Sequence, residues 1–252
     1  MVRTWNLEPR ASSLDLSIRS WGAGPRHALL LHGISSNAEG WWRVGPALAE
    51  LGYTVTAPDL RGHGMSPTSA DLTLASYTAD VLAIRPGWDL ILGHSLGGAV
   101  AVLALKERPG LTPVLILEDP AIAIPAPELA IESLLKSYTA PISQEEVARR
   151  NPTWNTEDCR IKVSAIIESR PVMVEQTIRQ NVPWNLVEEV VALEVPTLIL
   201  GAEIQPVVPA EFGRYLAGMN PNLTFHQIPG SSHSMHRDEF DSFWARVVDF
   251  LP

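Results

Sequence analysis

The chain of 252 residues contains one cysteine, Cys159, and no segment rich in lysine or arginine. A single cysteine excludes an internal disulfide framework and is typical of a reducing compartment. The net charge of −9 disfavours nucleic acids and anionic membrane surfaces as partners, and no basic segment offers an exception.

Long apolar runs are also missing. HALLLHG (27–33) and PVLILEDPAIAIP (113–125) are much shorter than the roughly 20 residues that cross a bilayer. The start, MVRTWNLEPRASS, lacks the apolar core of a secretory signal, and no repeat or low-complexity tract is present. We therefore expect a cytoplasmic globular protein, a monomer or homodimer, with no membrane and no nucleic acid as partner.

The residues that are present alternate between two patterns. Short apolar segments, several of them continuous as in strands buried on both faces, lie at 14–21, 28–32, 53–59, 89–94, 113–119, 196–202 and 223–228. Helical patterns lie at 41–51, 74–84, 97–107, 209–218 and 237–250. This alternation predicts an α/β fold, a mostly parallel sheet with helices on both faces.

Residues 120–195 interrupt the alternation, because helical patterns follow one another there without an evident strand. A segment of this length is too long for a simple connection. We expect it to form a small helical cap on a core domain made of residues 1–119 and 196–252. Ligands of such sheets bind beyond the carboxyl ends of the strands, which the cap would cover.

The sequence GHSLG (93–97) fits the nucleophile-elbow pattern G-x-S-x-G, with a strand before it and a helix after it. Ser95 is the candidate nucleophile, since glycines at 93 and 97 leave room for a very tight turn. The backbone amide of Leu96 is one expected oxyanion donor. The amide of Ile34, after the strand that ends in LHG (31–33), is the second, and Gly33 lets that loop turn sharply.

The candidate general base is His233, in the loop PGSSHS (229–234) between the last strand and the last helix. His236 is an alternative, and the two histidines could instead hold a metal ion. No carboxylates of metalloenzyme spacing surround them, so we expect no metal. Arg61 and His63, in DLRGHGMS (59–66), are expected to brace loops around the site.

Taken in order, the motifs LHG, DLRGHGMS, GHSLGG and PGSSHS resemble those of the α/β-hydrolase superfamily, over nearly the whole chain outside 120–195. The resemblance implies an eight-stranded, mainly parallel sheet, a helical cap between strands six and seven, and the chain order Ser–acid–His. Ser95 and His233 occupy the matching positions, with Ile34 and Leu96 as oxyanion donors. Members with an aspartate nucleophile are disfavoured because residue 95 is serine.

The acid departs from the family pattern. Ile204 and Gln205 stand where members usually carry an aspartate after strand seven, and Glu203 lies one position earlier. The alternative is the end of strand six, LILEDP (115–120), which is similar to the zearalenone-lactone hydrolases, with a glutamate shortly before a proline. We rank Glu118 first, Glu203 second and Asp119 third.

The expected function is that of a serine hydrolase that cleaves a carboxylic ester or lactone through an acyl-enzyme, without cofactor or metal. Gly33, Trp154 and Trp184 are expected to contact a medium-sized, largely apolar small-molecule substrate. Arginines of the cap could recognise an anion, although a solvated face is the simpler interpretation (Arg149, Arg150, Arg160 and Arg170). The alternatives are a C–C bond hydrolase, thioesterase or perhydrolase with the same triad, and a catalytically weak ligand-binding member of the fold.

Overall fold

The computed structural model describes residues 14–139 and 142–252. The prediction that no secretory signal is present rests on residues 1–13, which lie outside this range. Among the described residues, no helix is long and apolar enough to cross a membrane.

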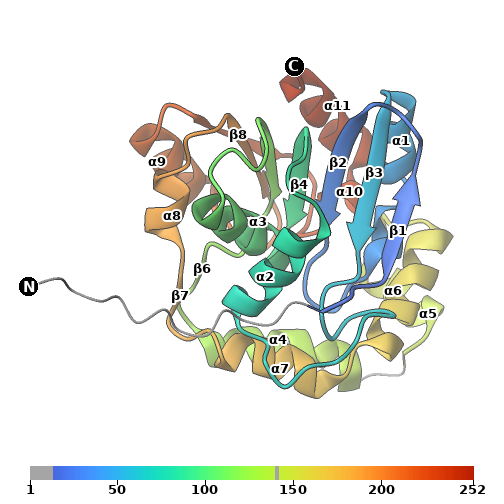
Figure 1. The fold of residues 1–252 in the computed structure, drawn as a ribbon. Helices are drawn as coiled ribbons and strands as arrows, with labels where there is room; N and C mark the ends of the chain where they lie inside the picture. Colours follow the sequence, from blue (N-terminus) through green and yellow to red (C-terminus); the bar gives the residue numbers. More distant parts are fainter. Residues whose placement is uncertain (1–13, 140–141) are drawn as a thin grey trace, which may run out of the picture.

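A seven-stranded sheet forms the centre of the molecule, in the order β1-β3-β2-β4-β5-β8-β9 (Figure 1). Its first strand is antiparallel to β3, and all other neighbours are parallel. These strands are the seven that the sequence patterns predict; the eighth, implied by the family resemblance, is not in the sheet within the described ranges. The bounds are β1 (Ile18–Trp21), β2 (Arg26–Leu31), β3 (Tyr53–Pro58), β4 (Leu90–His94), β5 (Leu115–Glu118), β8 (Thr197–Ala202) and β9 (Leu223–Ile228).

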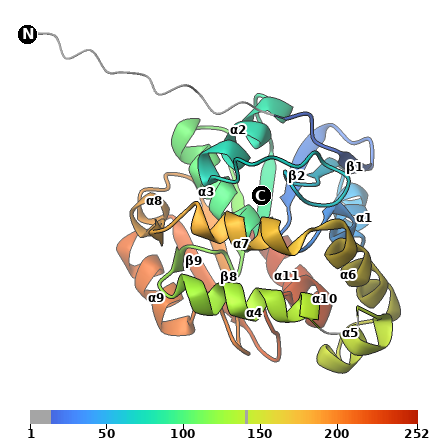
Figure 2. The ribbon, with the colours of Figure 1, turned by 90° about the horizontal axis from the view of Figure 1, so that it is seen from below.

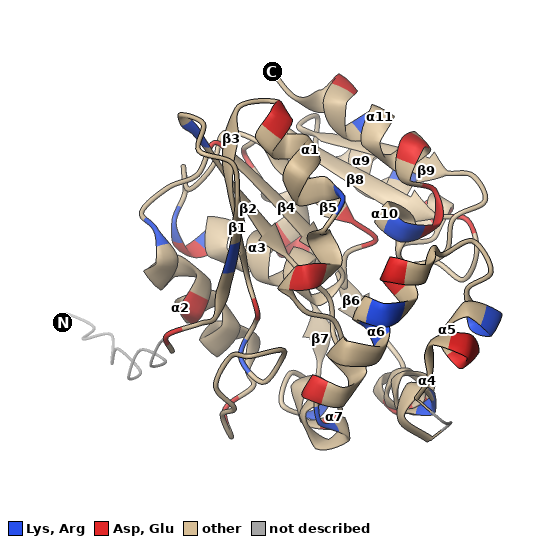
Figure 3. Cartoon of the chain, turned by 90° about the vertical axis from the view of Figure 1, so that its right-hand side faces the viewer, with Lys and Arg blue, Asp and Glu red and all other residues tan. Residues whose placement is uncertain are grey.

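Helices cover both faces of the sheet because successive residues of the central strands point to opposite sides. Ala28 and Leu30 pack with α1 (Val44–Glu50) and α11 (Phe240–Phe250), whereas Leu29 and Leu31 pack toward the helices of the other face. Charged residues lie mostly on helices and loops, and the central strands are largely free of them (Figure 3). The helices of the second face are α2 (Leu74–Ile84), α3 (Leu96–Glu107), α8 (Val187–Val191) and α9 (Ala210–Met219).

Four of the five described helices in the segment between β5 and β8 lie below the sheet in Figure 1, and the fifth is α8. Figure 2 shows the molecule from below, with these four helices in front of the sheet. Where the segment leaves and re-enters the core, β6 (Ala123–Ile124) pairs with β7 (Trp184–Asn185). The sequence patterns predict no strand there, because two-residue strands are too short to produce a periodic pattern. The four helices are α4 (Pro127–Thr139), α5 (Gln144–Arg150), α6 (Thr156–Glu168) and α7 (Pro171–Arg179).

The register of the parallel strands brings the ends of β2, β4 and β5 to one level. Leu31 pairs with Gly93, and His94 pairs with Glu118. The residues that follow these strands therefore meet at the carboxyl edge of the sheet, where the helices of the insertion cover them.

Candidate active site

Ser95 lies in a tight turn between the last residue of β4 and the first residue of α3, with φ of +53°. Such a backbone angle is uncommon for any residue other than glycine and indicates local strain. A Cβ on Gly93 would lie 2.5 Å from the carbonyl oxygen of Gly97, and one on Gly97 would lie 2.2 Å from that of Leu31. The strand–turn–helix context predicted for GHSLG is present, and both glycines are required by close backbone contacts.

Two backbone amides lie beside Ser95. Leu96 is the first residue of α3, so its N–H has no carbonyl one turn earlier in the helix to bond. The Ile34 amide, in the turn after β2, donates no hydrogen bond to another described backbone group. A Cβ on Gly33 would lie 3.0 Å from the Cβ of Ser95, which shows how closely this turn passes the serine.

His32 fixes the turn that carries Ile34. Its Nδ1 donates to the carbonyl oxygen of Gly33 at 2.8 Å, and its Nε2 accepts from the amide of Leu60 at 3.0 Å. Burial lowers the pKa of His32 to about 4, so the ring is neutral at physiological pH, as this pair of bonds requires. Arg61 is bound to Asp80 at 2.6 Å and His63 packs edge-on against His32, so both line the supporting loops.

Asp119 is the carboxylate that contacts His233. Its Oδ2 lies 2.7 Å from His233 Nδ1, and its side chain is fully buried. The backbone amides of Val207 and Val208 donate to the same carboxylate at 3.0 and 2.9 Å. The loop after β8, where the family usually places its acid, therefore supplies amides that hold an acid from the end of β5.

The prediction that Glu118 pairs with His233 is wrong in this geometry. Glu118 is the last residue of β5, while Asp119 turns out of the strand with φ of +38°, so their side chains leave in different directions. Glu118 instead accepts from the amide and from Nδ1 of His236, at 2.9 and 2.8 Å. Glu203, ranked second, accepts from the amide of Gly230 at 2.8 Å and does not contact His233.

Sequence reasoning missed the support that His94 and His236 give to the His233 loop. His94 Nε2 lies 2.8 Å from the carbonyl oxygen of His233, and their rings lie 4.5 Å apart. His236, in α10 (Met235–Asp238), anchors the other side of the loop through Glu118. Burial lowers the pKa of His236 to about 3 and that of His94 well below its usual value, so both rings are neutral.

A cavity of about 580 Å³ contains Ser95 and His233 and extends under the insertion. Trp154, a predicted substrate contact, lines it, and its Nε1 donates to Asp238 at 2.7 Å. Trp184 does not line it: the indole is 3% exposed and donates to the carbonyl oxygen of Ala121 at 2.7 Å, within the core. The apolar part of the lining includes Ala121, Ala123, Ile124, Leu134 and Ile178.

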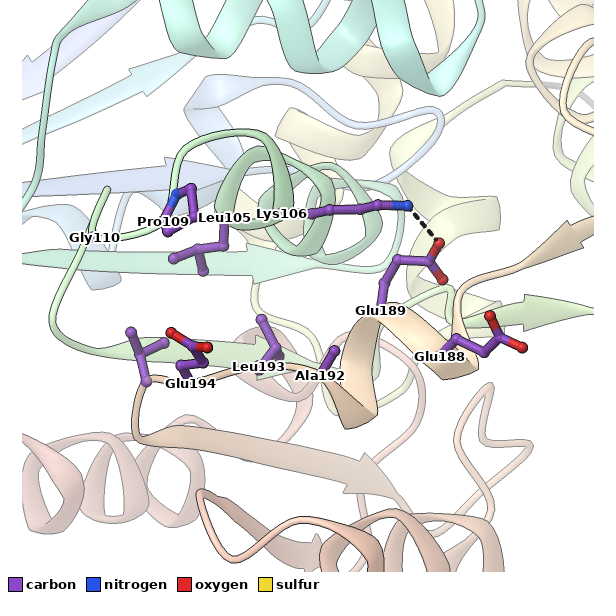
Figure 4. Close-up of a pocket in the computed structure, with 10 residues that line it drawn as sticks. Leu105, Lys106, Pro109, Gly110, Glu188, Glu189, Ala192, Leu193 and Glu194 are labelled. Carbon is purple, nitrogen blue, oxygen red and sulfur yellow. Dashed lines mark hydrogen bonds and ion pairs between the residues drawn. The ribbon is translucent and has the colours of Figure 1, made fainter. Parts of the chain in front are cut away.

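A second hollow, of about 410 Å³, lies between α3 and α8 (Figure 4). Lys106 points across it to Glu189 and bonds it at 3.0 Å. The lining contains no serine, histidine or cysteine, so this hollow has no candidate nucleophile or base. In the part of the chain that the structure describes, no group of three or more His, Cys, Asp or Glu side chains is placed to hold a metal ion.

The sequence model of the alpha/beta hydrolase family matches residues 28–249. The chain belongs to this family. Lipase LipV of Mycobacterium tuberculosis is 35% identical over 116 residues, which is 44% of this chain and 44% of the lipase. N-formylmaleamate deformylase of Pseudomonas putida is 28% identical over 255 residues, 90% of each chain.

Solved structures share the fold of this α/β hydrolase at low identity. The enol-lactonase of Burkholderia xenovorans superposes with a TM-score of 0.78, at 21% identity, over 94% of this chain and 96% of that one. An esterase of Exiguobacterium antarcticum gives 0.78 at 18% identity, over 94% and 95% of the two chains. This α/β hydrolase carries a helical insertion between β5 and β8 of its mainly parallel sheet.

Proposed function

We propose that the protein is a serine hydrolase that cleaves a carboxylic ester or lactone, with Ser95, His233 and Asp119 as its triad. The observation that carries this proposal is the 2.7 Å contact between buried Asp119 and His233, in a cavity that also contains Ser95. A carboxylate in this position holds the imidazole in one tautomer, with Nδ1 protonated and Nε2 free to accept a proton.

The proposed reaction passes through an acyl-enzyme. Ser95 Oγ attacks the carbonyl carbon of the substrate and gives its proton to His233 Nε2, while the amides of Ile34 and Leu96 stabilise the oxyanion. The imidazolium then protonates the leaving alcohol, and an acyl-enzyme remains. Water, deprotonated by the same histidine, attacks the acyl carbon and releases the acid.

Residues 120–195 are proposed to act as the cap of this site, with α4 to α7 as its roof. The apolar side chains of Ile124, Leu134 and Ile178 line the cavity from this segment and favour an acyl or alcohol group of moderate size. The esterase and enol-lactonase that share the fold, and the lipase that matches part of the sequence, act on this bond type.

Hydrolysis of an N-formyl amide is the second candidate. It is favoured by the match to N-formylmaleamate deformylase, which at 90% of both chains is more extensive than the match to the lipase. The same triad serves both reactions, because His233 protonates the leaving group in each case, an alcohol oxygen for an ester and a nitrogen for an amide.

The first experiment is labelling with a fluorophosphonate probe, followed by assay of p-nitrophenyl esters, lactones and formyl amides. We expect the wild-type protein to be labelled on Ser95 and to turn over at least one class, and Ser95→Ala to lose both properties. Ser20→Ala, on the exposed surface of β1, is the matched control and should behave as wild type. A folded wild-type protein that is not labelled would contradict the proposal.

A further inference from the structure

The cavity that contains Ser95 has an uneven charge. Two cationic side chains, Lys162 and Arg237, line it, and its lining includes no aspartate or glutamate. They come from α6 and α10, and Figure 3 shows basic positions on both helices on the same side of the molecule.

Lys162 lies beside the turn that carries the proposed oxyanion donor. Its Nζ donates to the carbonyl oxygen of Ser35 at 2.8 Å and lies 3.2 Å from Ser35 Oγ. Ser35 directly follows Ile34 in the chain. Within residues 14–139 and 142–252, no carboxylate oxygen forms an ion pair with this ammonium group at 4.0 Å or less. Lys162 is thus a partly buried cation with neutral oxygen partners.

Arg237 is 4% exposed, and its charge is only partly balanced. The nearest carboxylate is that of Asp158, 4.0 Å from Nε, and this oxygen also accepts from the indole of Trp42. Arg237 Nη2 lies 3.4 Å from Ser36 Oγ, and the guanidinium packs over Trp154 at 4.7 Å. Both cations therefore contact the serines that follow Ile34.

The other charged groups near Lys162 are already paired. Glu146 and Arg150 of α5 share a small hollow with it, but Glu146 binds Arg149 at 2.8 Å and Arg150 at 2.6 Å. Arg160 is paired with Glu157 at 2.7 Å. The cap arginines considered in the sequence analysis do not line the cavity that contains Ser95.

Cations that are withdrawn from water without a counter-charge are costly, and an anionic ligand offsets this cost. We propose that the substrate carries a carboxylate, which Lys162 and Arg237 bind beside Ser95. This inference rests on the proposed function and narrows it: the ester, lactone or amide is a carboxylate-bearing compound with a short apolar chain, rather than a fully apolar one. Burial and then the charge of Arg237 lower the pKa of Lys162 to about 7, which agrees with two cations held close together in one cavity.

The test compares two esters of similar length, one anionic and one neutral. Mono-p-nitrophenyl glutarate carries a carboxylate, and p-nitrophenyl pentanoate is neutral. We expect the wild-type kcat/KM to be at least about tenfold higher for the glutarate, and Lys162→Gln to lose most of this preference through KM. Lys162→Arg should keep it. Lys136→Gln, which removes an exposed lysine of α4, is the matched control and should leave the ratio unchanged.

Two results would overturn the proposal. One is a wild-type enzyme that shows no preference for the anionic ester. The other is a Lys162→Gln variant that loses the same factor on both esters, because the lysine would then act only on the Ser35 turn. Thermal unfolding of each variant shows that it is folded.

A failure of the proposed function is separable from a failure of this inference. If no ester or amide is hydrolysed, calorimetry with glutarate still measures the anion site in Ser95→Ala. We expect binding there and its loss in the Ser95→Ala, Lys162→Gln double variant. Equal binding by the two proteins, or none by either, would count against the anion site alone.

The preference should also depend on pH, since Lys162 must be protonated to attract an anion. Its pKa of about 7 predicts that the ratio of the two kcat/KM values falls as pH rises from 6 to 8.5. His233 acts on both esters, so its effect on the rate is the same for both and cancels in the ratio of the two kcat/KM values. The titratable and charged groups around Lys162 are Arg237, His94, His233 and His236 of the cavity, His32 and His63 of the supporting loops, Tyr138 of α4, and Glu146 and Arg150 of α5.

Discussion

Replacement of Asp119 by asparagine tests the most specific claim about the site. The substitution keeps the shape of the side chain but removes the charge that faces His233 Nδ1 at 2.7 Å. An amide in this position can donate to Nδ1 and favour the wrong tautomer, an effect that costs about 10⁴ in kcat in triads of this kind. That factor corresponds to about 5.4 kcal/mol of transition-state stabilisation.

Glu118→Gln is the control for Asp119→Asn, because the two acids are neighbours in the chain and both are fully buried. Glu118 contacts His236, so its loss should weaken the anchoring of α10 and leave the chemistry largely intact. We expect kcat within about tenfold of wild type and a loss of roughly 1–3 kcal/mol in the free energy of unfolding. Glu203→Gln, which alters an exposed side chain, should change neither.

The assay is hydrolysis of the best p-nitrophenyl ester, with the active-site concentration set by fluorophosphonate titration and the fold checked by thermal unfolding. Normalising to active sites separates a slow enzyme from a partly unfolded one. The reasoning would be refuted if folded Glu118→Gln lost 10³-fold or more while Asp119→Asn lost less than tenfold.

The remaining predictions concern stability and the supporting loops. Gly97→Ala should destabilise the protein by about 3 kcal/mol, because the added Cβ would lie 2.2 Å from the carbonyl oxygen of Leu31. Gly218→Ala, in α9 with no described atom outside the local helix backbone within 4 Å of the added Cβ, should instead stabilise it by about 0.5–1 kcal/mol, and chemical denaturation compares the two. Arg61→Met leaves Asp80 buried without its 2.6 Å partner and should cost about 3–5 kcal/mol in the same measurement; a loss below 1 kcal/mol would show that the pair contributes little.

Local sequence was sufficient to predict the elements around Ser95. The central strands are predictable because continuous apolar runs are typical of strands buried on both faces, and all seven predicted strands are present in the sheet. The turn at Ser95 was found because its glycines are required by contacts within a few residues, or with the adjacent strand. Trp154 lines the cavity whereas Trp184 packs in the core, since an aromatic residue in the inserted segment has no local signal for the side it faces.

The choice of the acid needed the tertiary structure. Glu118 and Asp119 are adjacent carboxylates of similar chemistry, and alternation along β5 guarantees only that they point to different sides. The side on which the loop with His233 lies depends on how β9 and α10 pack, some 110 residues later in the chain. The backbone amides of Val207 and Val208 donate to Asp119, and this contact cannot be predicted from residue types because every residue except proline carries a backbone amide.

By itself, the sequence determined the α/β fold, the nucleophile turn at Ser95 and the candidate base His233, because these depend on short periodicities and local backbone geometry. The carboxylate that contacts His233, and the presence of Lys162 and the partly balanced Arg237 in the same cavity, follow from the tertiary structure alone. Both results depend on contacts between segments far apart in the chain, whose side-chain directions are fixed when the sheet, the insertion and the last helices pack together.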